Sequence, residues 1–178
     1  MHRLLLKMGK RNQEVTIRWV SNQIQKEIKM NVLSAVIAGI VATTVFTMVL
    51  VMAPRMGMPK MDIVSLLGSM FSTKSNPVLG WTLHLMMGVV FALAYAFLWW
   101  LGFGAATWGI GLIFGAIHWL IVGMVMGMIP MVHVGIKRGA VQAPGLWMTK
   151  NGGAMAFMGG LVGHAIFGAV VALVYASL

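Results

Sequence analysis

The chain contains no cysteine and only three acidic residues among its 178 residues. Without cysteine it forms neither disulfides nor thiolate metal sites, and a cysteine nucleophile is excluded. The acids are Glu14, Glu27 and Asp62, and none lies inside a long apolar segment. Proton-coupled transporters usually carry carboxylates within the membrane, and hydrolases that use a carboxylate pair need two acids close together. The sequence therefore predicts a protein that is not an acid–base enzyme, and it offers little support for a proton-coupled transporter.

Charged residues of either sign are scarce. They make up 9% of the chain, while 60% of the residues are hydrophobic and the mean hydropathy is +0.89. A soluble domain of this size needs more charge to cover its surface. The 13 Lys and Arg residues, which give a net charge of +10, lie in an N-terminal tail and two loops. These features predict an integral membrane protein whose partners are the lipid bilayer and its anionic headgroups, with no nucleic acid.

Four apolar segments are long enough to cross a bilayer, for which about 20 residues span a core of about 30 Å. The expected spans are residues 32–53, which end before Pro54, and residues 78–101, 108–132 and 155–178. A polar loop separates the first span from the second and the third from the fourth, whereas a short uncharged turn joins the second to the third. We therefore expect an all-α polytopic membrane protein with four transmembrane helices.

The second and fourth spans carry the same residues in the same places, eighty positions apart. A glycine, a histidine, a second glycine and two alanines follow one another at steps of four: Gly80, His84, Gly88, Ala92 and Ala96 in one span, and Gly160, His164, Gly168, Ala172 and Ala176 in the other. A step of four keeps these residues on one slowly drifting stripe of a helix. Small residues on such a stripe let another helix approach closely, so the stripe predicts helix-packing positions.

The first and third spans also carry stripes of mostly small residues at the same offset. They consist of Ala35, Gly39, Thr43 and Thr47 in the first span and Gly115, Trp119, Gly123 and Gly127 in the third, with Trp119 as the exception. We therefore predict two duplicated helical hairpins, at about residues 32–101 and 108–178, within a transmembrane domain of residues 32–178. A unit with an even number of spans keeps its orientation when it is duplicated. The parallel repeats should be related by a pseudo-two-fold axis along the membrane normal.

Residues 1–31 form a separate basic segment. Ile17, Val20, Ile24 and Ile28 recur there at steps of three and four, while basic and amide residues occupy the other faces. This pattern predicts an N-terminal amphipathic helix that lies in the headgroup plane. A basic amphipathic tail prefers the anionic cytoplasmic leaflet, whereas the six basic residues of the two long loops favour cytoplasmic loops. The orientation is therefore open, and we lean toward cytoplasmic loops.

His84 and His164 are the main candidates for a functional site, because they lie at matching depth in the two copies. An imidazole from each of two helices, with glycines a turn away, is one arrangement that holds a haem b. The interpretation that we favour is an interhelical hydrogen bond from each ring, as buried polar residues in membranes usually form. We therefore expect no cofactor, and keep haem b or copper bound by His84 and His164 as the alternative.

Two further histidines and the methionines provide a weaker metal-site hypothesis. His118 lies near the middle of the third span and His133 at its loop end, and neither has a histidine counterpart in the first copy. Met56 and Met58 belong to a methionine cluster at the start of the first loop, and a second cluster lies at the end of the third span. Thioethers favour Cu(I) as ligands. The competing interpretation is that methionine is a flexible apolar filler.

The paired Gly-x3-His-x3-Gly-x3-Ala helices and the loop MAPRMGMPKMDI resemble small, uncharacterised four-helix membrane proteins of bacteria. The likeness covers residues 30–178 and excludes the tail. It implies a location in the bacterial inner membrane and no particular activity. We expect a non-enzymatic structural or accessory subunit that packs with other membrane subunits or with copies of itself. A haem- or copper-binding protein is the alternative, and a small transporter is the weaker alternative.

Overall fold

The computed structural model describes Ile17 and residues 30–178. The chain divides into two units, Met1–Asn31 and Val32–Leu178, and the second contains all four predicted spans. The amphipathic helix predicted for the tail lies outside the described residues, Ile17 excepted. Its position on the membrane surface stays a prediction.

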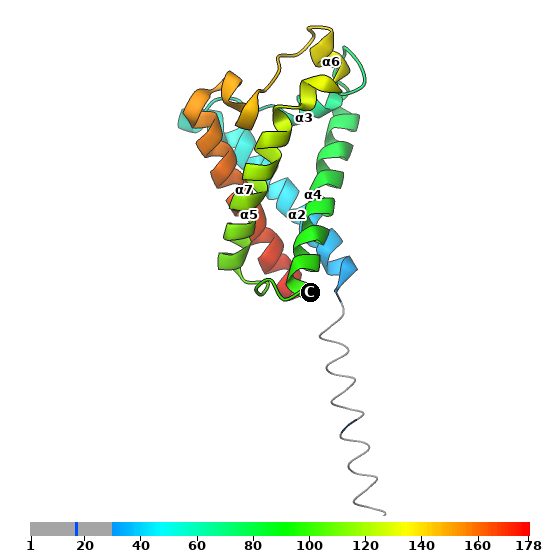
Figure 1. Ribbon diagram of the computed structural model, residues 1–178, viewed down its shortest axis with the longest axis vertical. Helices are drawn as coiled ribbons and strands as arrows, with labels where there is room; N and C mark the ends of the chain where they lie inside the picture. Colours follow the sequence, from blue (N-terminus) through cyan, green and yellow to red (C-terminus); the bar gives the residue numbers. More distant parts are fainter. Residues whose placement is uncertain (1–16, 18–29) are drawn as a thin grey trace, which may run out of the picture. The chain divides into compact units, whose positions relative to one another are not determined.

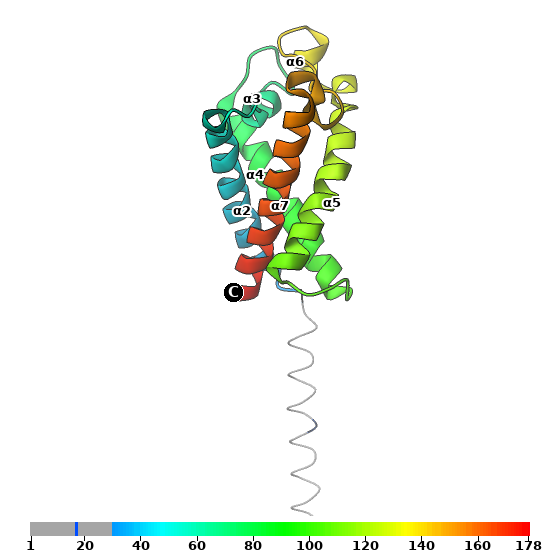
Figure 2. The same ribbon diagram turned by 90° about the vertical axis from the view of Figure 1, so that its left-hand side faces the viewer.

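Four long helices form most of the unit Val32–Leu178 (Figure 1). They are α2 (Val32–Met52), α4 (Pro77–Trp100), α5 (Trp108–Met126) and α7 (Gly153–Ser177). These four are the helices of the described part that are long and apolar enough to cross a membrane, and that part contains no strand. The all-helical class and the four candidate spans are thus confirmed. Helix α7 lies between α2 and α5 and packs closely on both, as Figure 2 shows, while α4 packs along α2.

Local sequence explains where α4 begins. Its first residue is Pro77. Proline lacks an N–H, but an N–H at the first position of a helix has no acceptor within the helix, so nothing is lost there. The Asn76 side chain accepts hydrogen bonds from the N–H groups of Val78 (3.0 Å) and Leu79 (3.2 Å). Such a cap satisfies donors that the first turn of a helix leaves open.

Helix α5 is shorter than the predicted span, which reached residue 132. It ends at Met126, and a short 3₁₀ helix, η2 (Ile129–Met131), follows. Pro130 lies inside η2, and a proline has no N–H with which to continue the hydrogen bonds of an α-helix. The apolar run therefore continues beyond the α-helix, and composition alone overestimated the length of the α-helical part.

The two long loops contain short helices that gather at one end of the four-helix unit, which we call the loop end (Figure 1). They are η1 (Ala53–Met56), α3 (Ile63–Gly68), η2, α6 (Val134–Lys137) and η3 (Leu146–Asn151). The α4–α5 turn and the end of α7 lie at the opposite end. Helix α3 packs on α4, and η3 packs on α5 and α7, so the loop end covers one end of the helices.

Glycines lie at the close contacts of two helix pairs. In one pair a glycine of α4 contacts small residues of α2, and in the other a glycine of α7 contacts a small residue of α5. A Cβ atom placed on Gly88 would overlap the side chain of Thr43 and lie 3.2 Å from the carbonyl oxygen of Gly39. A Cβ atom on Gly168 would overlap the carbonyl oxygen of Gly111. Backbones approach this closely only where side chains are small or absent. The two glycines thus lie at the close helix contacts that the stripe predicts.

The contacts relate α2 to α5 by a different offset from the one read in the sequence. Gly39 and Gly111, which meet Gly88 and Gly168, are 72 positions apart, whereas Gly88 and Gly168 are 80 positions apart. The difference of eight residues turns the helix by about 80° beyond two full turns, so the two offsets place different faces of α5 at the contact. Trp119, the counterpart of Gly39 at an offset of 80, is instead a large side chain buried in the core.

The ends of the two stripes differ from the prediction. Ala92, Ala96 and Ala172 are fully buried, but Ala176 is exposed. Ala176 lies one residue before the end of α7, whereas Ala96 lies four residues before the end of α4. At the other end, a Cβ atom on Gly80 would overlap the carbonyl of Val64, so this glycine packs against α3 rather than a long helix.

Candidate functional site

A cavity of about 50 Å³ lies inside the four-helix unit, next to the loop end. All four long helices and both long loops contribute to its wall, which is mostly apolar. The residues that matter most for its chemistry are Phe46 of α2, His84 of α4, His118 and Trp119 of α5, and His164 of α7. The fold thus brings the two matched histidines to one cavity and adds His118 to them.

His84 forms a hydrogen bond from α4 to α2. Its Nε2 lies 3.1 Å from Oγ1 of Thr47, and that hydroxyl donates its own proton to the carbonyl of Thr43 (2.7 Å). Oγ1 must therefore accept from His84, so Nε2 carries the proton and Nδ1 is the unprotonated nitrogen. Nδ1 is fully buried and has no hydrogen-bond partner among the described residues. A side chain that is only 6% exposed thus presents an unpaired acceptor in the core.

His164 makes its hydrogen bond within its own helix. Its Nδ1 lies 2.8 Å from the carbonyl oxygen of Gly160, one turn earlier in α7. A carbonyl only accepts, so Nδ1 carries the proton and Nε2 is the unprotonated nitrogen. The interhelical hydrogen bond expected of both matched histidines therefore forms at His84 and not at His164.

His118 connects α5 to α4. Its Nδ1 lies 3.2 Å from the hydroxyl of Tyr95, and its ring packs on Phe91 with 3.7 Å between ring centroids. The same ring meets His164 edge to face, at 4.8 Å and 88°. Helices α4 and α5 therefore face each other through aromatic side chains, and His118 belongs to the same cluster as His164.

Phe46 packs against both matched histidines. The distance between ring centroids is 6.0 Å to His84 and 4.8 Å to His164. One aromatic side chain of α2 thus contacts the matched imidazoles of both α4 and α7.

Trp119 is the second residue lining the cavity that carries an unpaired polar atom. The side chain is 1% exposed, and its ring centroid lies 4.9 Å from that of His164. Its Nε1–H is fully buried and has no hydrogen-bond partner among the described residues. The sequence contained one signal for this residue, because Trp119 is the large exception in a stripe of small residues.

Four methionines line the cavity, namely Met61, Met87, Met126 and Met148. None of them was singled out as a metal ligand from the sequence. Met61 and Met126 belong to the two methionine clusters noted there. Met56 is exposed on η1. Met58 is half-buried, and its terminal methyl lies 2.8 Å from where a Cβ atom on Gly159 would be.

An unusual backbone places Met148. Trp147 (φ 47°) and Met148 (φ 56°) are consecutive non-glycine residues with left-handed conformations in η3. Such residues cost of order 1–3 kcal/mol each and persist only where the surroundings impose them. The Trp147 ring packs on Gly123, where a Cβ atom would overlap it, and its Nε1–H donates to the carbonyl of Leu120 (3.2 Å). These contacts hold Trp147 against α5 while Met148 lines the cavity. Sequence spacing carries no signal for such a conformation.

The metal set proposed from the sequence, which included His118 and His133, is not brought together. His133 lies at the loop end, fully buried. Its Nε2–H donates to the carbonyl of Leu66 (2.8 Å), and its Nδ1 accepts from the N–H of Ile136 (3.1 Å). Both nitrogens are therefore occupied, which leaves no lone pair for a metal. Among the described residues, no three His, Asp or Glu side chains form a group that could hold a metal ion.

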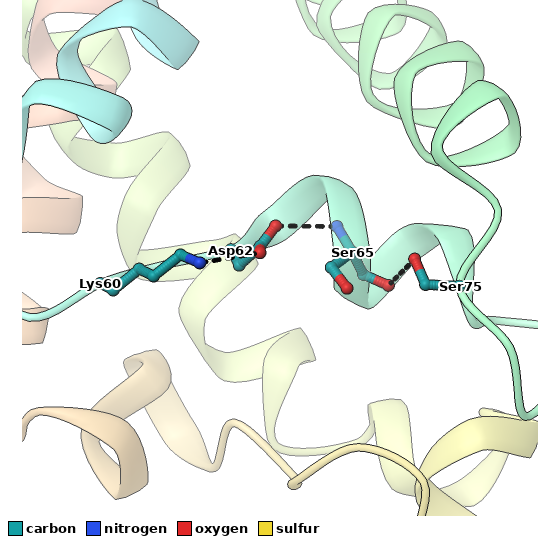
Figure 3. Close-up of polar contacts among 4 residues, drawn as sticks. All are labelled: Lys60, Asp62, Ser65 and Ser75. Atoms are coloured by element: carbon teal, nitrogen blue, oxygen red, sulfur yellow. Dashed lines mark hydrogen bonds and ion pairs between the residues drawn. The ribbon is translucent and has the colours of Figure 1, made fainter.

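Asp62, the acid of the first loop, has a structural role (Figure 3). Its Oδ1 accepts a hydrogen bond from the N–H of Ser65 (3.0 Å) and so caps α3, and its Oδ2 lies 3.5 Å from Nζ of Lys60. The hydroxyl of Ser75 donates to the carbonyl of Ser65 (3.2 Å) and ties the start of α4 to the same turn. The carboxylate thus organises the loop end.

Four apolar spans and a cavity lined by three imidazoles define the class, a small four-helix membrane protein. Within that class, residues 30–178 match the model of a family of unknown function, DUF6789, and the chain belongs to this family. The match begins at residue 30, as does the resemblance seen in the sequence, and leaves out the basic tail. No curated protein and no solved structure matches the chain.

Proposed function

We propose that the protein is a non-enzymatic integral membrane protein that holds a small guest in its central cavity and acts as an accessory subunit of a larger membrane assembly. Two unpaired polar atoms on side chains that line the cavity, Nδ1 of His84 and Nε1 of Trp119, carry the proposal. A buried polar group without a partner costs about 1–3 kcal/mol, and native proteins contain few of them. A guest that satisfies one or both atoms would recover part of this free energy.

The chemistry of the cavity favours binding over catalysis. Of the described residues, only Asp62 carries a side-chain carboxylate, and this group caps α3. The hydroxyl of Thr47 sets the tautomer of His84, and the carbonyl of Gly160 sets that of His164. Among the described residues, no carboxylate orients either ring in the way that a carboxylate orients a catalytic histidine. A transporter has less support, because the four spans carry no acidic or basic side chain.

The size of the cavity favours a guest much smaller than a haem. Pockets for drug-sized ligands measure roughly 300–1,000 Å³, whereas this cavity measures about 50 Å³. Phe46 also packs against both His84 and His164, so an aromatic side chain already fills part of the space beside the two imidazoles. Of the two groups considered from the sequence, copper is therefore the better match.

We further propose that the unit arose by duplication of a hairpin, with parallel copies around an axis along the membrane normal. The support is the repeated contact of a glycine in the later helix, Gly88 or Gly168, with a glycine in the earlier one. The two halves are not equivalent in detail, because α2 packs closely on α7 whereas α4 meets α5 through aromatic side chains. The asymmetry accounts for a cavity with a third histidine on one side only.

The proposed role as an accessory subunit and the proposed location in the bacterial inner membrane rest on the outer faces of the helices and on the resemblance seen in the sequence. Large apolar side chains are exposed on the outer faces of all four long helices, where lipid, another subunit or a second copy of the chain would contact them. The resemblance to bacterial proteins favours the bacterial inner membrane. These faces do not by themselves select one of the three contacts, so the proposed guest is the part of the function that an experiment tests most directly.

The test is to ask whether the protein purified in detergent retains a guest in the cavity. Val122 lines the cavity and is buried, whereas Val125 on the same helix is exposed, so Val122→Phe fills the cavity and Val125→Phe is the matched control. We expect elemental analysis and mass spectrometry of extracts to find a guest in the parent and in Val125→Phe, but not in Val122→Phe. Size-exclusion chromatography checks that all three fold. The absence of any guest from the parent, or its retention by Val122→Phe, would contradict the proposal.

A further inference from the structure

The cavity wall combines two kinds of metal ligand and lacks a third. Its ligand-bearing side chains are the imidazoles of His84, His118 and His164 and the thioethers of Met61, Met87, Met126 and Met148. None of the described residues that line it carries a carboxylate. Hard cations such as Mg²⁺ and Ca²⁺ select oxygen ligands, whereas thioethers select Cu(I) and imidazole also suits copper. The donor set therefore points to a soft ion.

The hydrogen bonds leave imidazole lone pairs available as ligands. Because His84 donates through Nε2 to Thr47, its unprotonated Nδ1 holds a lone pair with no partner. Because His164 donates through Nδ1 to the carbonyl of Gly160, its lone pair is on Nε2. Two neutral imidazoles at one cavity are thus already in the protonation state that a metal requires, and no proton has to be released.

The charge of the ion follows from the surroundings. Neither imidazole nor thioether carries a charge, so the full charge of the ion would stay uncompensated by the cavity wall. The cost of burying a charge rises steeply with its size in a medium of low dielectric constant. A monovalent ion is thus favoured over a divalent one. The volume of about 50 Å³ is large enough for such an ion.

Imidazoles alone do not complete the site. The described histidines do not form a group of three that could hold a metal ion. A metal site in this cavity therefore needs at least one thioether ligand beside the imidazoles. Met148 lines the cavity from a left-handed backbone at Trp147 and Met148, a conformation that persists only where the surroundings impose it. Met126 reaches the same cavity from α5 and is equally buried.

We infer that the guest is a soft monovalent metal ion of the Cu(I) class, bound within the membrane by the imidazoles of His84 and His164 and by thioethers that include Met126 and Met148. This inference rests on the proposed function, because it specifies the chemistry of the guest in the same cavity. It replaces the metal set considered from the sequence with one that the fold brings together.

The experiment uses the full chain in detergent and Ag(I), a redox-inert soft cation, followed by Cu(I) under reducing conditions. Equilibrium dialysis with elemental analysis should find about one Ag(I) per chain at this site. The double variant Met126→Leu/Met148→Leu removes two cavity sulfurs with little change in volume, and we expect at least about tenfold weaker binding. Met124→Leu/Met128→Leu, at exposed positions in the same region, is the matched control and should bind like the parent. His84→Gln should also weaken binding, while it retains a donor for Thr47.

The possible outcomes separate the inference from the proposed function. If neither Ag(I) nor Cu(I) binds, but another guest is retained by the parent and lost from Val122→Phe, the soft-ion inference fails and the proposed function stands. If the exposed methionine pair is needed and the buried pair is not, the ion is bound at the surface and the inference fails. If Zn²⁺ binds with the same stoichiometry and the same dependence on the variants, the site is not selective for soft ions. If the parent holds no guest and binds no ion, both proposals fail.

Discussion

Single methyl groups decide how closely the helices of this protein pack. Gly88 and Gly168 lie where a Cβ atom would overlap a side chain or a carbonyl of the neighbouring helix. Gly109, also in a long helix, has no atom within 4 Å of the position that its Cβ would take. In a bilayer, where van der Waals contact is a main source of helix association, this difference should decide the effect of a substitution.

We therefore expect Gly88→Ala and Gly168→Ala each to lower the free energy of unfolding by about 1–3 kcal/mol, the usual cost of overpacking. Gly109→Ala should leave it unchanged or raise it slightly, since alanine favours the helix more than glycine does. Thermal unfolding of the three variants in detergent measures the difference. Equal stability of all three would show that the glycine stripe faces lipid.

At the scale of elements, the loop end depends on a histidine that the sequence suggested as a metal ligand. His133 donates to the carbonyl of Leu66 in α3 and accepts from the N–H of Ile136 in α6. One side chain therefore joins the first long loop to the second. It also caps α6, a helix of four residues that is too short to be stable by itself.

We expect His133→Ala to destabilise the protein by about 1–3 kcal/mol for each of the two groups left without a partner. The control is Met131→Ala, at an exposed position two residues earlier, which should have little effect. Limited proteolysis of the two loops, together with the unfolding temperature, measures the change. Parent-like stability combined with loss of a bound metal would instead indicate that His133 is a ligand.

At the scale of the whole unit Val32–Leu178, charge is distributed unevenly between the two ends of the described helices. The exposed basic residues of the described spans and loops belong to the loop end: Arg55, Lys60, Lys74, Lys137, Arg138 and Lys150. Among these, the ion pair recorded is that of Lys60 with Asp62. The turn between α4 and α5 at the opposite end carries no charge. Because Lys and Arg accumulate in cytoplasmic loops, this asymmetry favours a cytoplasmic loop end.

The chain has no cysteine, so a single introduced thiol reports the orientation. We expect Ala105→Cys, in the α4–α5 turn, to react with a membrane-impermeant maleimide added to intact bacterial cells. Ala140→Cys, exposed at the loop end, should react only after the membrane is made permeable. Labelling in the reverse order would place the loop end outside, and would also favour a cytoplasmic location for the basic tail.

The sequence by itself determined the class of the protein, the four spans and the small-residue faces of the helices. These features are local, because hydrophobic length decides whether a segment can cross a bilayer and a step of four decides which residues share a helical face. It also identified His84 and His164 as buried polar residues in equivalent places. Proline and capping residues such as Asn76 explain the ends of the helices on the same local basis.

Only the tertiary structure decided how these faces meet and what they enclose. The offset of 72 between Gly39 and Gly111 depends on how the helices pack against each other, whereas the offset of 80 read from the sequence pairs Gly39 with Trp119. Phe46 and His118 join the matched histidines through contacts between helices that are distant in sequence. Met148 reaches the cavity through a backbone conformation that its neighbours impose. The cavity is therefore a property of the packed unit, because no single segment contains its wall.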